Sequence, residues 1–346
     1  MKVLYHAPDY VCLDGEAGGV YREILTRRRM AESAGARTGL FHMWEADRLR
    51  SAEVLHTFFP AAGSYPLCRA ARAAGCRLVV SPIYDYRLPA PVARAWIALS
   101  HAARPLLSHL GETARVLAIA DSVVVRSRAE WRDMRRVFGI PPEKLHLVWN
   151  ALPETAAPEA GEAEIPPEFR GIERGVLFAG DVANPRKNVA RLIAAAGPLD
   201  VPVVVCGPLR PGLAADRVMA LAAAYRAVRV AGQVSRGLLA ALMRRARVFA
   251  LPSLCEGTGL AALEAGCAGC NVVVTPAGGT RDYFGDLATY VNPRSVRSIR
   301  AGLASALSAG RSGALGEHLR GNFSVPRLAA LLMGAYRGDS GPACLP

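Results

Sequence analysis

The sequence lacks an apolar segment long enough to cross a membrane. A membrane-spanning helix needs about 20 predominantly apolar residues, and no uncharged apolar run of about 18 residues occurs in the 346 positions. The first residues, MKVLYHAPDY, become polar after a short apolar run. This pattern is typical of a first β-strand and not of a signal peptide. We therefore expect a cytoplasmic protein.

Lysine is scarce: only three of the 42 basic residues are lysines, in a chain with a net charge of +13. Together with the abundance of Ala and Gly, this bias is typical of a GC-rich genome, so the charge alone indicates no polyanionic partner. The alternative is a basic surface for anionic lipid, best supported by Arg22, Arg27, Arg28 and Arg29 on one predicted helix. Arginines and aromatic residues do not interleave as base stacking requires, which disfavours nucleic acid.

The eight cysteines are scattered through a long chain, so the disulfide framework of small secreted domains is not expected. Cys267 and Cys270 have the C-x-x-C spacing, but no second pair completes a zinc site. They also stand at the end of a predicted helix, whereas a redox thiolate is stabilised at a helix start. We expect small buried residues at a helix–strand joint.

Short apolar, β-branched runs alternate with amphipathic segments along the chain. Continuous Val, Ile and Leu runs between helices are typical of parallel strands that are buried on both faces. Both halves therefore favour an α/β fold with doubly wound, Rossmann-like sheets. The predicted strands are residues 3–5, 54–58, 78–81, 122–125, 176–178, 203–206, 228–230, 248–251 and 272–275.

A segment rich in Pro, Ala and Glu, residues 151–174, separates the two halves. It has no sustained periodicity, which is typical of a linker. We predict an N-terminal domain over residues 1–155, a linker over 156–172 and a C-terminal domain over 173–324. The last residues, 325–346, form a helix and a tail that we expect to pack back on the N-terminal domain.

The residues that follow the strands are the candidates for ligand binding, because ligands of doubly wound sheets bind beyond the strands' carboxyl ends. After the first strand, Gly18 and Gly19 open a helix. Glycines at such a point let backbone amides approach an anion closely. A glycine pair at a strand–helix turn is also common without any ligand.

Two cations follow the strand at residues 176–178. Arg186 and Lys187 fall in the first turn of a helix that we expect to begin at Asn184 or Pro185. Cations at a helix N-terminus oppose the helix dipole, so their presence favours a bound anion over a solvated cation pair. One of the only three lysines stands here.

The stretch C-E-G-T-G-L-A-A-L-E-A-G, residues 255–266, places one carboxylate before a glycine turn and a second inside an apolar helix. We expect Thr258 to cap this helix, whose free amides form an anion site. Glu256 and Glu264 would then flank the anion, and carboxylates make strong hydrogen bonds to hydroxyl groups. A phosphate with hydroxyls on either side describes a nucleotide-sugar.

In this order along the chain, the motifs resemble those of retaining GT-B glycosyltransferases of group 1, family 4. The strongest element is the E-x7-E signature from Glu256 to Glu264. The other elements are the glycine pair at 18–19, A-D-S-V-V-V-R-S (120–127), V-W-N-A (148–151), G-D-V-A-N-P-R-K-N (180–188), A-L-P-S (250–253) and Y-V-N-P (290–293). The resemblance covers most of the chain and implies a GT-B fold, in which two Rossmann-like domains face each other across a cleft.

The resemblance also implies a role for each matching residue. Lys187 would bind the donor diphosphate, Glu264 the ribose hydroxyls, and Glu256 the transferred sugar near the reacting carbon. Gly207 and Pro208 would lie near the base. The implied donor-binding residues are Gly18, Gly19, Arg186, Lys187, Gly207, Pro208, Thr258, Gly259, Leu260 and Glu264, and the implied catalytic residues are Glu256 and Lys187.

Two positions depart from the family's pattern. Many members have an arginine as a phosphate ligand where this chain has Asp181. Asp181 must therefore point away from a diphosphate, or Arg186 must replace that arginine. Many members also have a histidine after the strand that is followed here by Tyr84 and Asp85, either of which would contact the sugar instead.

The implied reaction moves a hexose-type sugar from a UDP- or GDP-linked donor to an acceptor hydroxyl with retention of anomeric configuration. Its pathway would be cell-envelope or polysaccharide synthesis. No metal is expected, because the sequence shows no cluster of carboxylates to hold one. His56 is expected to face the cleft, with a structural or acceptor-contacting role and not as a base.

The expected partners are the nucleotide-sugar donor and a glycan or lipid-linked acceptor, with peripheral contact to an anionic membrane at its inner face. The main alternative is a catalytically inactive nucleotide-sugar-binding or scaffold protein on the same fold, for which Asp181 is the argument. An epimerase or phosphorylase is disfavoured by the E-x7-E spacing and by the lack of a recognisable phosphorylase cofactor lysine. A nucleic-acid-binding protein comes last, and its affinity should fall steeply with salt.

Overall fold

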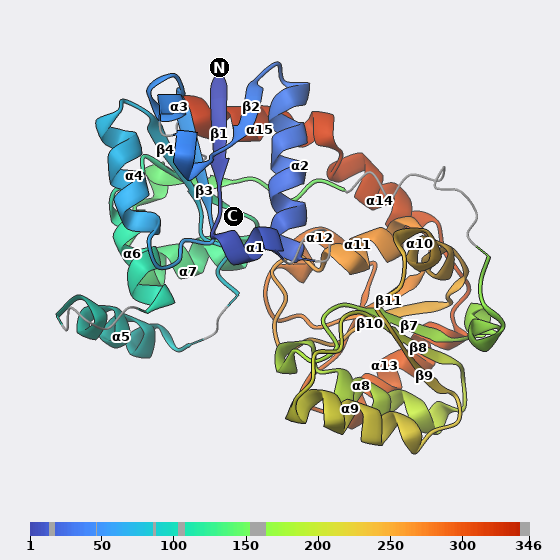
Figure 1. Cartoon of the computed structure of the whole chain (residues 1–346). Coiled ribbons are helices and arrows are strands. Elements are labelled where there is room, and N and C mark those ends of the chain that lie inside the picture. The colour runs from blue at the N-terminus through green and yellow to red at the C-terminus, as the bar shows by residue number, and fades with distance from the viewer. Residues whose placement is uncertain (14–17, 46, 86–87, 103–107, 153–163, 340–346) are drawn as a thin grey trace. The chain divides into compact units, whose positions relative to one another are not determined.

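The computed structural model of the chain describes residues 1–13, 18–45, 47–85, 88–102, 108–152 and 164–339. It divides into two compact units (Figure 1). The first unit comprises residues 1–151 and 323–346, and the second comprises residues 152–322. Of the predicted linker, residues 156–163 lie outside the described part of the chain.

The first unit is built on a parallel sheet with the strand order β2-β1-β3-β4-β5-β6. Its strands are β1 (Lys2–His6), β2 (Arg37–Leu40), β3 (Val54–Phe58), β4 (Arg77–Ser81), β5 (Ser122–Val125) and β6 (Leu145–Leu147). Its helices are α1 (Asp9–Leu13), α2 (Gly19–Ser33), α3 (Asp47–Arg50), α4 (Ser64–Ala73), α5 (Ala90–Ala102), α6 (His109–Ala118), α7 (Arg128–Phe138) and α15 (Val325–Arg337). The last helix, α15, packs against α2 and against β4, β5 and β6.

The second unit has a parallel sheet with the order β12-β11-β10-β7-β8-β9. Its strands are β7 (Val176–Ala179), β8 (Val203–Cys206), β9 (Val228–Gly232), β10 (Val248–Leu251), β11 (Asn271–Val274) and β12 (Thr289–Tyr290). Its helices are α8 (Val189–Ala196), α9 (Leu213–Ala223), α10 (Arg236–Arg245), α11 (Leu260–Cys267), α12 (Thr280–Phe284), α13 (Val296–Ser308) and α14 (Ala314–Asn322). The prediction of two doubly wound parallel sheets is confirmed.

The predicted strands are all present, with bounds that shift by two residues at most. Strands β5, β8 and β10 are buried along their whole length, as their continuous Val-rich runs require. The sequence analysis missed β2, β6 and β12. Both β2 and β12 are sheet edges without fully buried residues, and β6 is a three-residue strand, so none of them forms a long apolar run.

The strand orders define where each unit can bind a ligand. In the first unit the order reverses between β1 and β3, and in the second unit between β7 and β10. Crevices at the carboxyl ends of such strand pairs are the usual ligand sites of doubly wound sheets. The loops after β1, β3, β7 and β10 are therefore the segments of interest.

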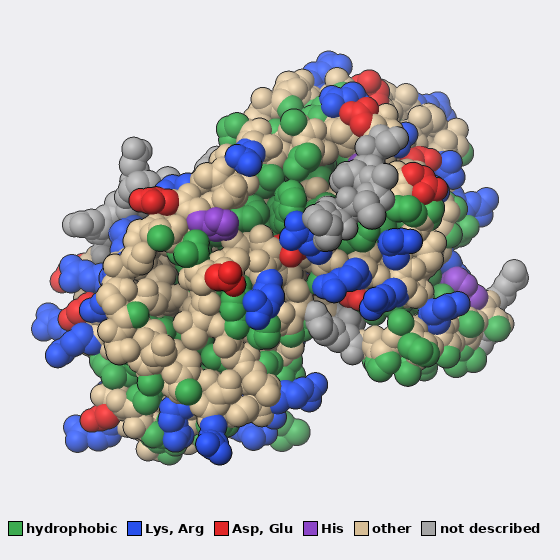
Figure 2. Space-filling view, turned by 180° about the vertical axis from the view of Figure 1, so that it is seen from behind, with side chains coloured by type: hydrophobic (Ala, Val, Ile, Leu, Met, Phe, Trp, Pro, Cys, Tyr) green, Lys and Arg blue, Asp and Glu red, His purple; other side chains and the backbone are tan. Residues whose placement is uncertain are grey.

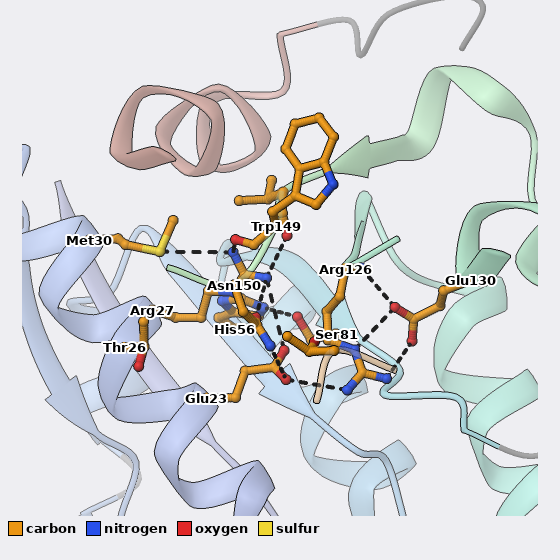
Figure 3. A network of polar contacts seen from close by, with 12 residues as sticks. Glu23, Thr26, Arg27, Met30, His56, Ser81, Arg126, Glu130, Trp149 and Asn150 are labelled. Atoms are coloured by element: carbon orange, nitrogen blue, oxygen red, sulfur yellow. Dashed lines mark hydrogen bonds and ion pairs between the residues drawn. The ribbon is translucent and has the colours of Figure 1, made fainter. Parts of the chain in front are cut away.

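A buried polar network holds the first sheet against α2 and α7 (Figure 3). Arg126, at the end of β5, lies 2.8 Å from the Asp85 carboxylate, 3.3 Å from that of Glu130 and 3.5 Å from that of Glu23. The Arg126 side chain is almost fully buried among these three carboxylates, and burial raises the pKa of Glu23. These contacts join β5, α2, α7 and the segment after β4.

Arg27 of α2 is the second buried cation of this network (Figure 3). Its guanidinium donates hydrogen bonds to the carbonyl oxygens of Val148 (2.6 Å) and Trp149 (3.0 Å) and to Asn150 Oδ1 (3.0 Å). The prediction that Arg27 belongs to a basic outer surface is wrong, because these contacts satisfy the guanidinium inside the unit. The neighbouring Arg28 pairs with Glu32 at 2.8 Å.

His56 lies in the interior of the first sheet, and the prediction that it faces a cleft is wrong. It has no exposed surface, and its ring nitrogens contact Tyr336 Oη (2.9 Å) and Ser81 Oγ (2.9 Å). Tyr336 belongs to α15 and also contacts Tyr5 Oη at 2.9 Å. Burial, and after it the charge of Arg27, lowers the pKa of His56 well below its ordinary value. His56 is thus a neutral structural residue that fastens α15 to the sheet.

The depressed pKa of His56 predicts an acid-sensitive fold. Below about pH 6.5 the unfolded chain takes up a proton at His56 that the folded chain does not, so folding loses up to about 1.4 kcal/mol per pH unit. In His56→Gln this contribution is absent. The difference in free energy of unfolding between wild type and variant, here called the stability gap, should therefore narrow as the pH falls. Urea unfolding between about pH 8 and 5.5 measures this gap.

Two further histidines calibrate the measurement. Burial lowers the pKa of His6 to about 4, so part of the pH slope should remain in both proteins. His101 is exposed, and His101→Gln serves as the control for a histidine-to-glutamine change as such. A stability gap that stays constant over the whole pH range would show that His56 does not stay neutral in the fold.

Candidate functional site in the second unit

The loop after β7 carries the predicted cations in a short 3₁₀ helix, Pro185–Lys187, and not in an α-helix. Asn184 starts it by accepting a hydrogen bond from the Arg186 amide at 3.0 Å. Helix α8 begins only at Val189, so the expected start at Asn184 or Pro185 is wrong. The cause is Asn188, whose left-handed backbone (φ +62°) cannot continue a helix.

Asn188 also joins three loops, a role that sequence reasoning missed. Its Nδ2 donates to the carbonyl oxygens of Pro252 (2.9 Å) and Pro293 (2.7 Å), which follow β10 and β12. Its Oδ1 accepts a hydrogen bond from Arg191 at 2.9 Å. Asparagine is one of the few residues other than glycine that adopts this backbone readily. Its presence at position 188 was therefore a signal in the sequence that the helix could not run through this position.

Glu256 lies at the centre of the site. Its Oε1 is 2.7 Å from Lys187 Nζ and 3.4 Å from Arg186 Nη1, and the residue is only 4% exposed. Burial opposes the ionisation of Glu256, but the charges of Lys187 and Arg186 outweigh burial and hold its pKa below the ordinary value. Two cations around one carboxylate leave a net positive charge at the switch point between β7 and β10.

The backbone of Glu256 is fixed by the segment after β11. Its amide donates to Ala277 O at 3.0 Å, and its carbonyl accepts from the Gly279 amide at 2.9 Å. At Gly278, between them, φ is +109° and a Cβ atom would approach Glu256 O to 1.9 Å. Only glycine fits there. Gly278 is a second residue of the site that sequence reasoning missed.

Helix α11 begins beside Glu256. Gly259 is its N-cap in a left-handed conformation (φ +77°), and no side chain caps the helix, so the prediction that Thr258 caps it is wrong. Thr258 instead contacts Tyr283 Oη at 3.4 Å. The amides of Leu260 and Ala261 have no carbonyl one helical turn earlier to bond to. Glu264, the other predicted carboxylate, is on this helix and is 7% exposed.

The loops after β7 and β8 touch each other. Gly207 has φ +136°, and a Cβ atom there would lie 1.7 Å from the Gly180 carbonyl oxygen. The Val182 amide donates to Pro208 O at 3.0 Å. Gly207 and Pro208 therefore adjoin the segment that leads to Lys187.

Asp181 stands in this same segment, where an acid would repel a phosphate. Its Oδ1 accepts a hydrogen bond from the Ala183 amide at 3.2 Å, and its Oδ2 lies 3.9 Å from Arg210 Nη1. The carboxylate is thus engaged by its own loop and by a cation of the next loop.

The remaining predicted residues belong to the first unit. Gly18 and Gly19 open α2, with Gly18 as its N-cap. Tyr84 is buried, and its ring packs edge-on against Phe138 at 5.5 Å. Asp85 is partly exposed and pairs with Arg126.

Cys267 ends α11 and Cys270 precedes β11, both as free thiols, as expected of a structural helix–strand joint. Within the described ranges, no group of three or more His, Cys, Asp or Glu side chains could hold a metal ion. No helix among the described residues is long and apolar enough to span a bilayer.

Known structures with the same architecture define the class of this protein. Sucrose-phosphate synthase from Thermosynechococcus elongatus superposes with a TM-score of 0.71 at 17% identity, over 97% of this chain and 98% of that one. HepE from Anabaena, in complex with UDP, does so with a TM-score of 0.69 at 14% identity, over 97% and 100% of the chains. The chain has the GT-B fold of these proteins.

The family follows from the sequence of the second unit. Residues 168–318 match the family described as "Glycosyl transferases group 1", and these residues form a group 1 glycosyltransferase domain. The chain is also 29% identical over 207 residues to the MMP α-(1→4)-mannosyltransferase of Mycolicibacterium hassiacum. That match covers 57% of this chain and 48% of the relative, so the chain spans about half the length of the curated relative.

The contact between Lys187 and Glu256 predicts strong energetic coupling. Glu256→Gln leaves two partly buried cations without their counter-charge, which should lower the free energy of unfolding by about 1–3 kcal/mol. Once Lys187→Met is present, the same change should cost less, with a coupling energy of about 0.5–3 kcal/mol. A double-mutant cycle followed by urea unfolding measures this coupling energy.

The exposed pair Arg48–Glu45, at 2.5 Å, is the matched control. Its coupling energy should stay within about 0.2–1 kcal/mol, because water screens both groups. Additive effects at Lys187 and Glu256 would show that the two side chains do not interact in the folded protein.

Proposed function

We propose that the chain transfers a hexose-type sugar from a UDP- or GDP-linked donor to an acceptor hydroxyl, with retention of anomeric configuration. The observation that carries this proposal is the Arg186–Lys187–Glu256 cluster at the switch point of a group 1 glycosyltransferase domain. The name of the mannosyltransferase relative and the UDP bound by HepE support a sugar nucleotide as the donor.

The chemistry requires stabilisation of negative charge on the leaving diphosphate. Lys187 and Arg186 supply two positive charges against the single negative charge of Glu256, so the cluster attracts an anion. The amides at the start of α11 add the positive end of a helix dipole. Fixed charges of this kind stabilise a transition state without reorganisation during the reaction. The proposal needs no metal.

The two glutamates would bind the neutral parts of the donor. In the proposed complex Glu264 accepts hydrogen bonds from the ribose hydroxyls and Glu256 contacts the transferred sugar, since charged acceptors bind hydroxyl donors strongly. Gly207 and Pro208 would lie beside the base, and amides of Thr258, Gly259 and Leu260 beside the sugar and phosphate. Gly18 and Gly19 would add amides from the first unit.

The alternative is an inactive protein that binds nucleotide-sugars. Asp181 was the argument for it, but the Asp181 carboxylate is engaged by the Ala183 amide and lies near Arg210. Lys187 and Glu256 also contact each other at 2.7 Å. These observations favour the active enzyme.

The proposed donor site predicts nucleotide-dependent stabilisation. A nucleoside diphosphate at about 100 times its dissociation constant should add roughly 2.7 kcal/mol. We expect UDP or GDP to raise the melting temperature of the wild type, and Lys187→Met and Glu264→Ala to reduce that rise. Glu168→Gln, an exposed glutamate of the same unit, is the control and should behave as wild type.

Incubation with the matching sugar conjugate and an acceptor completes the test, with the anomeric configuration of the product read by NMR. Transfer with retention supports the proposal. Nucleotide binding without transfer supports the inactive alternative, and the lack of a shift with any nucleotide overturns the donor site.

Peripheral contact with an anionic membrane is part of the same proposal, and α5 supports it better than α2. Val92, Trp96 and Leu99 lie on one face of α5 and are each 44–52% exposed; hydrophobic side chains gather on this helix at the lower right of Figure 2. Helix α5 carries Arg94 and no acid. Exposed apolar residues with a cation and an interfacial Trp are typical of helices that lie on anionic lipid.

We expect the double variant Val92→Gln/Trp96→Gln to bind vesicles of phosphatidylglycerol and phosphatidylcholine about tenfold less than wild type, a loss of about 1.4 kcal/mol. Co-sedimentation measures the binding. Leu213→Gln removes an exposed leucine of α9 and should have no effect. Equal binding by wild type and double variant would contradict the membrane contact.

A further inference from the structure

A pocket of about 460 Å³ opens in the first unit, at the carboxyl end of β3. It lies between α1, the loop after β3 and the start of α6, and it is lined by Tyr10, Phe59, Ser108, His109 and Glu112 among others. The β1/β3 pair is the switch point of this unit. The volume falls within the range of about 300–1,000 Å³ that small-molecule sites occupy.

One wall of the pocket is aromatic. The rings of Phe59 and His109 lie 4.3 Å apart between centroids at an angle of 35°, and Tyr10 meets Phe59 edge-on at 6.4 Å. Phe59 holds a positive φ of 47°, which is rare for a bulky residue and costly. The strained backbone is held by a hydrogen bond from the Phe59 amide to Ser81 O at 2.9 Å.

The pocket also has a charged group, the carboxylate of Glu112, which lines it and is 6% exposed. Its Oε1 accepts a hydrogen bond from the Tyr65 amide at 2.9 Å. Its Oε2 has no hydrogen-bond donor among the described residues and is not one of their enclosed, unsatisfied polar atoms, so it remains accessible. An accessible carboxylate oxygen in the lining of a pocket can accept a hydrogen bond from a hydroxyl group of a ligand.

The pocket is held in shape before any ligand binds. Thr113 Oγ1 donates to Pro60 O at 3.2 Å, which ties α6 to the loop after β3. The Glu112–Tyr65 contact ties α6 to α4. Ser108 caps α6 by accepting from the Gly111 amide at 3.0 Å. Preformed walls of this kind reduce the entropy that binding costs.

We propose that this pocket binds a neutral pyranose ring of the acceptor, an inference that rests on the proposed transferase function. The aromatic wall covers the apolar C–H face of a sugar ring, while the Glu112 carboxylate accepts hydrogen bonds from its hydroxyls. Burial lowers the pKa of the His109 imidazole, so no positive charge offsets Glu112. A phosphorylated or acidic sugar would be repelled.

Saturation-transfer NMR on the whole chain tests the pocket without any donor. The probes are methyl α-glucopyranoside and methyl α-mannopyranoside, with glucose 6-phosphate as the anionic comparison. We expect a signal from at least one methyl glycoside, a weaker one from the phosphate, and loss of the signal in Tyr10→Ala and Glu112→Gln. Trp44→Ala removes an exposed aromatic residue outside the pocket and should keep the signal.

Transfer kinetics provide the second readout. Both pocket variants should raise the acceptor KM tenfold or more, while kcat and nucleotide binding stay near wild type. Unchanged acceptor KM and unchanged saturation transfer in both variants would overturn the pocket, as would stronger binding of glucose 6-phosphate. A wild-type chain that binds methyl glycosides through Tyr10 and Glu112 but binds no nucleotide would instead refute the proposed donor reaction and leave the sugar pocket standing.

Discussion

The buried carboxylate of Glu256 is the charge around which the loops of the second unit are arranged. Lys187 and Arg186 follow β7, Glu256 follows β10, and only their mutual attraction makes it favourable to hold three charges so close together. The backbone supports this arrangement from two sides. Gly278 allows the segment after β11 to pair with Glu256, and Asn188 links the loops after β7, β10 and β12.

The first unit uses the reverse arrangement of charge. There a buried arginine, Arg126, lies among the carboxylates of Glu23, Asp85 and Glu130, whereas in the second unit a buried carboxylate lies between two cations. The pocket beside α6 also carries a carboxylate and no free cation among its described lining residues. Under the proposed function, this difference in charge would direct the donor and the acceptor to different units. The diphosphate of the donor favours the second unit, and a neutral acceptor sugar is tolerated in the first.

The sequence predicted the strands well because buried parallel strands are continuous apolar runs, and it singled out Glu256, Glu264 and Lys187 as candidates because charges beside such runs are rare. The sequence could not predict the hydrogen-bond or ion-pair partner of each polar residue. Histidine and arginine are common in functional sites, but His56 and Arg27 have structural partners inside the unit. His56 hydrogen-bonds with Tyr336, and Arg27 donates to the carbonyls of Val148 and Trp149. Those partners are far away in the sequence. The role of Gly278 likewise appears only in the folded unit, where its backbone lies against that of Glu256.

The distances in the second unit also indicate how the proposed donor would engage the site. Lys187 contacts Glu256 at 2.7 Å, so part of its charge is already neutralised. A diphosphate carries more negative charge than one carboxylate and therefore competes for Lys187. In the proposed complex Lys187 would turn to the phosphate. Glu256 would then lose its closest partner and need new hydrogen-bond donors, which the hydroxyls of the transferred sugar would provide. Phosphate binding and sugar recognition would thus be coupled through a single ion pair.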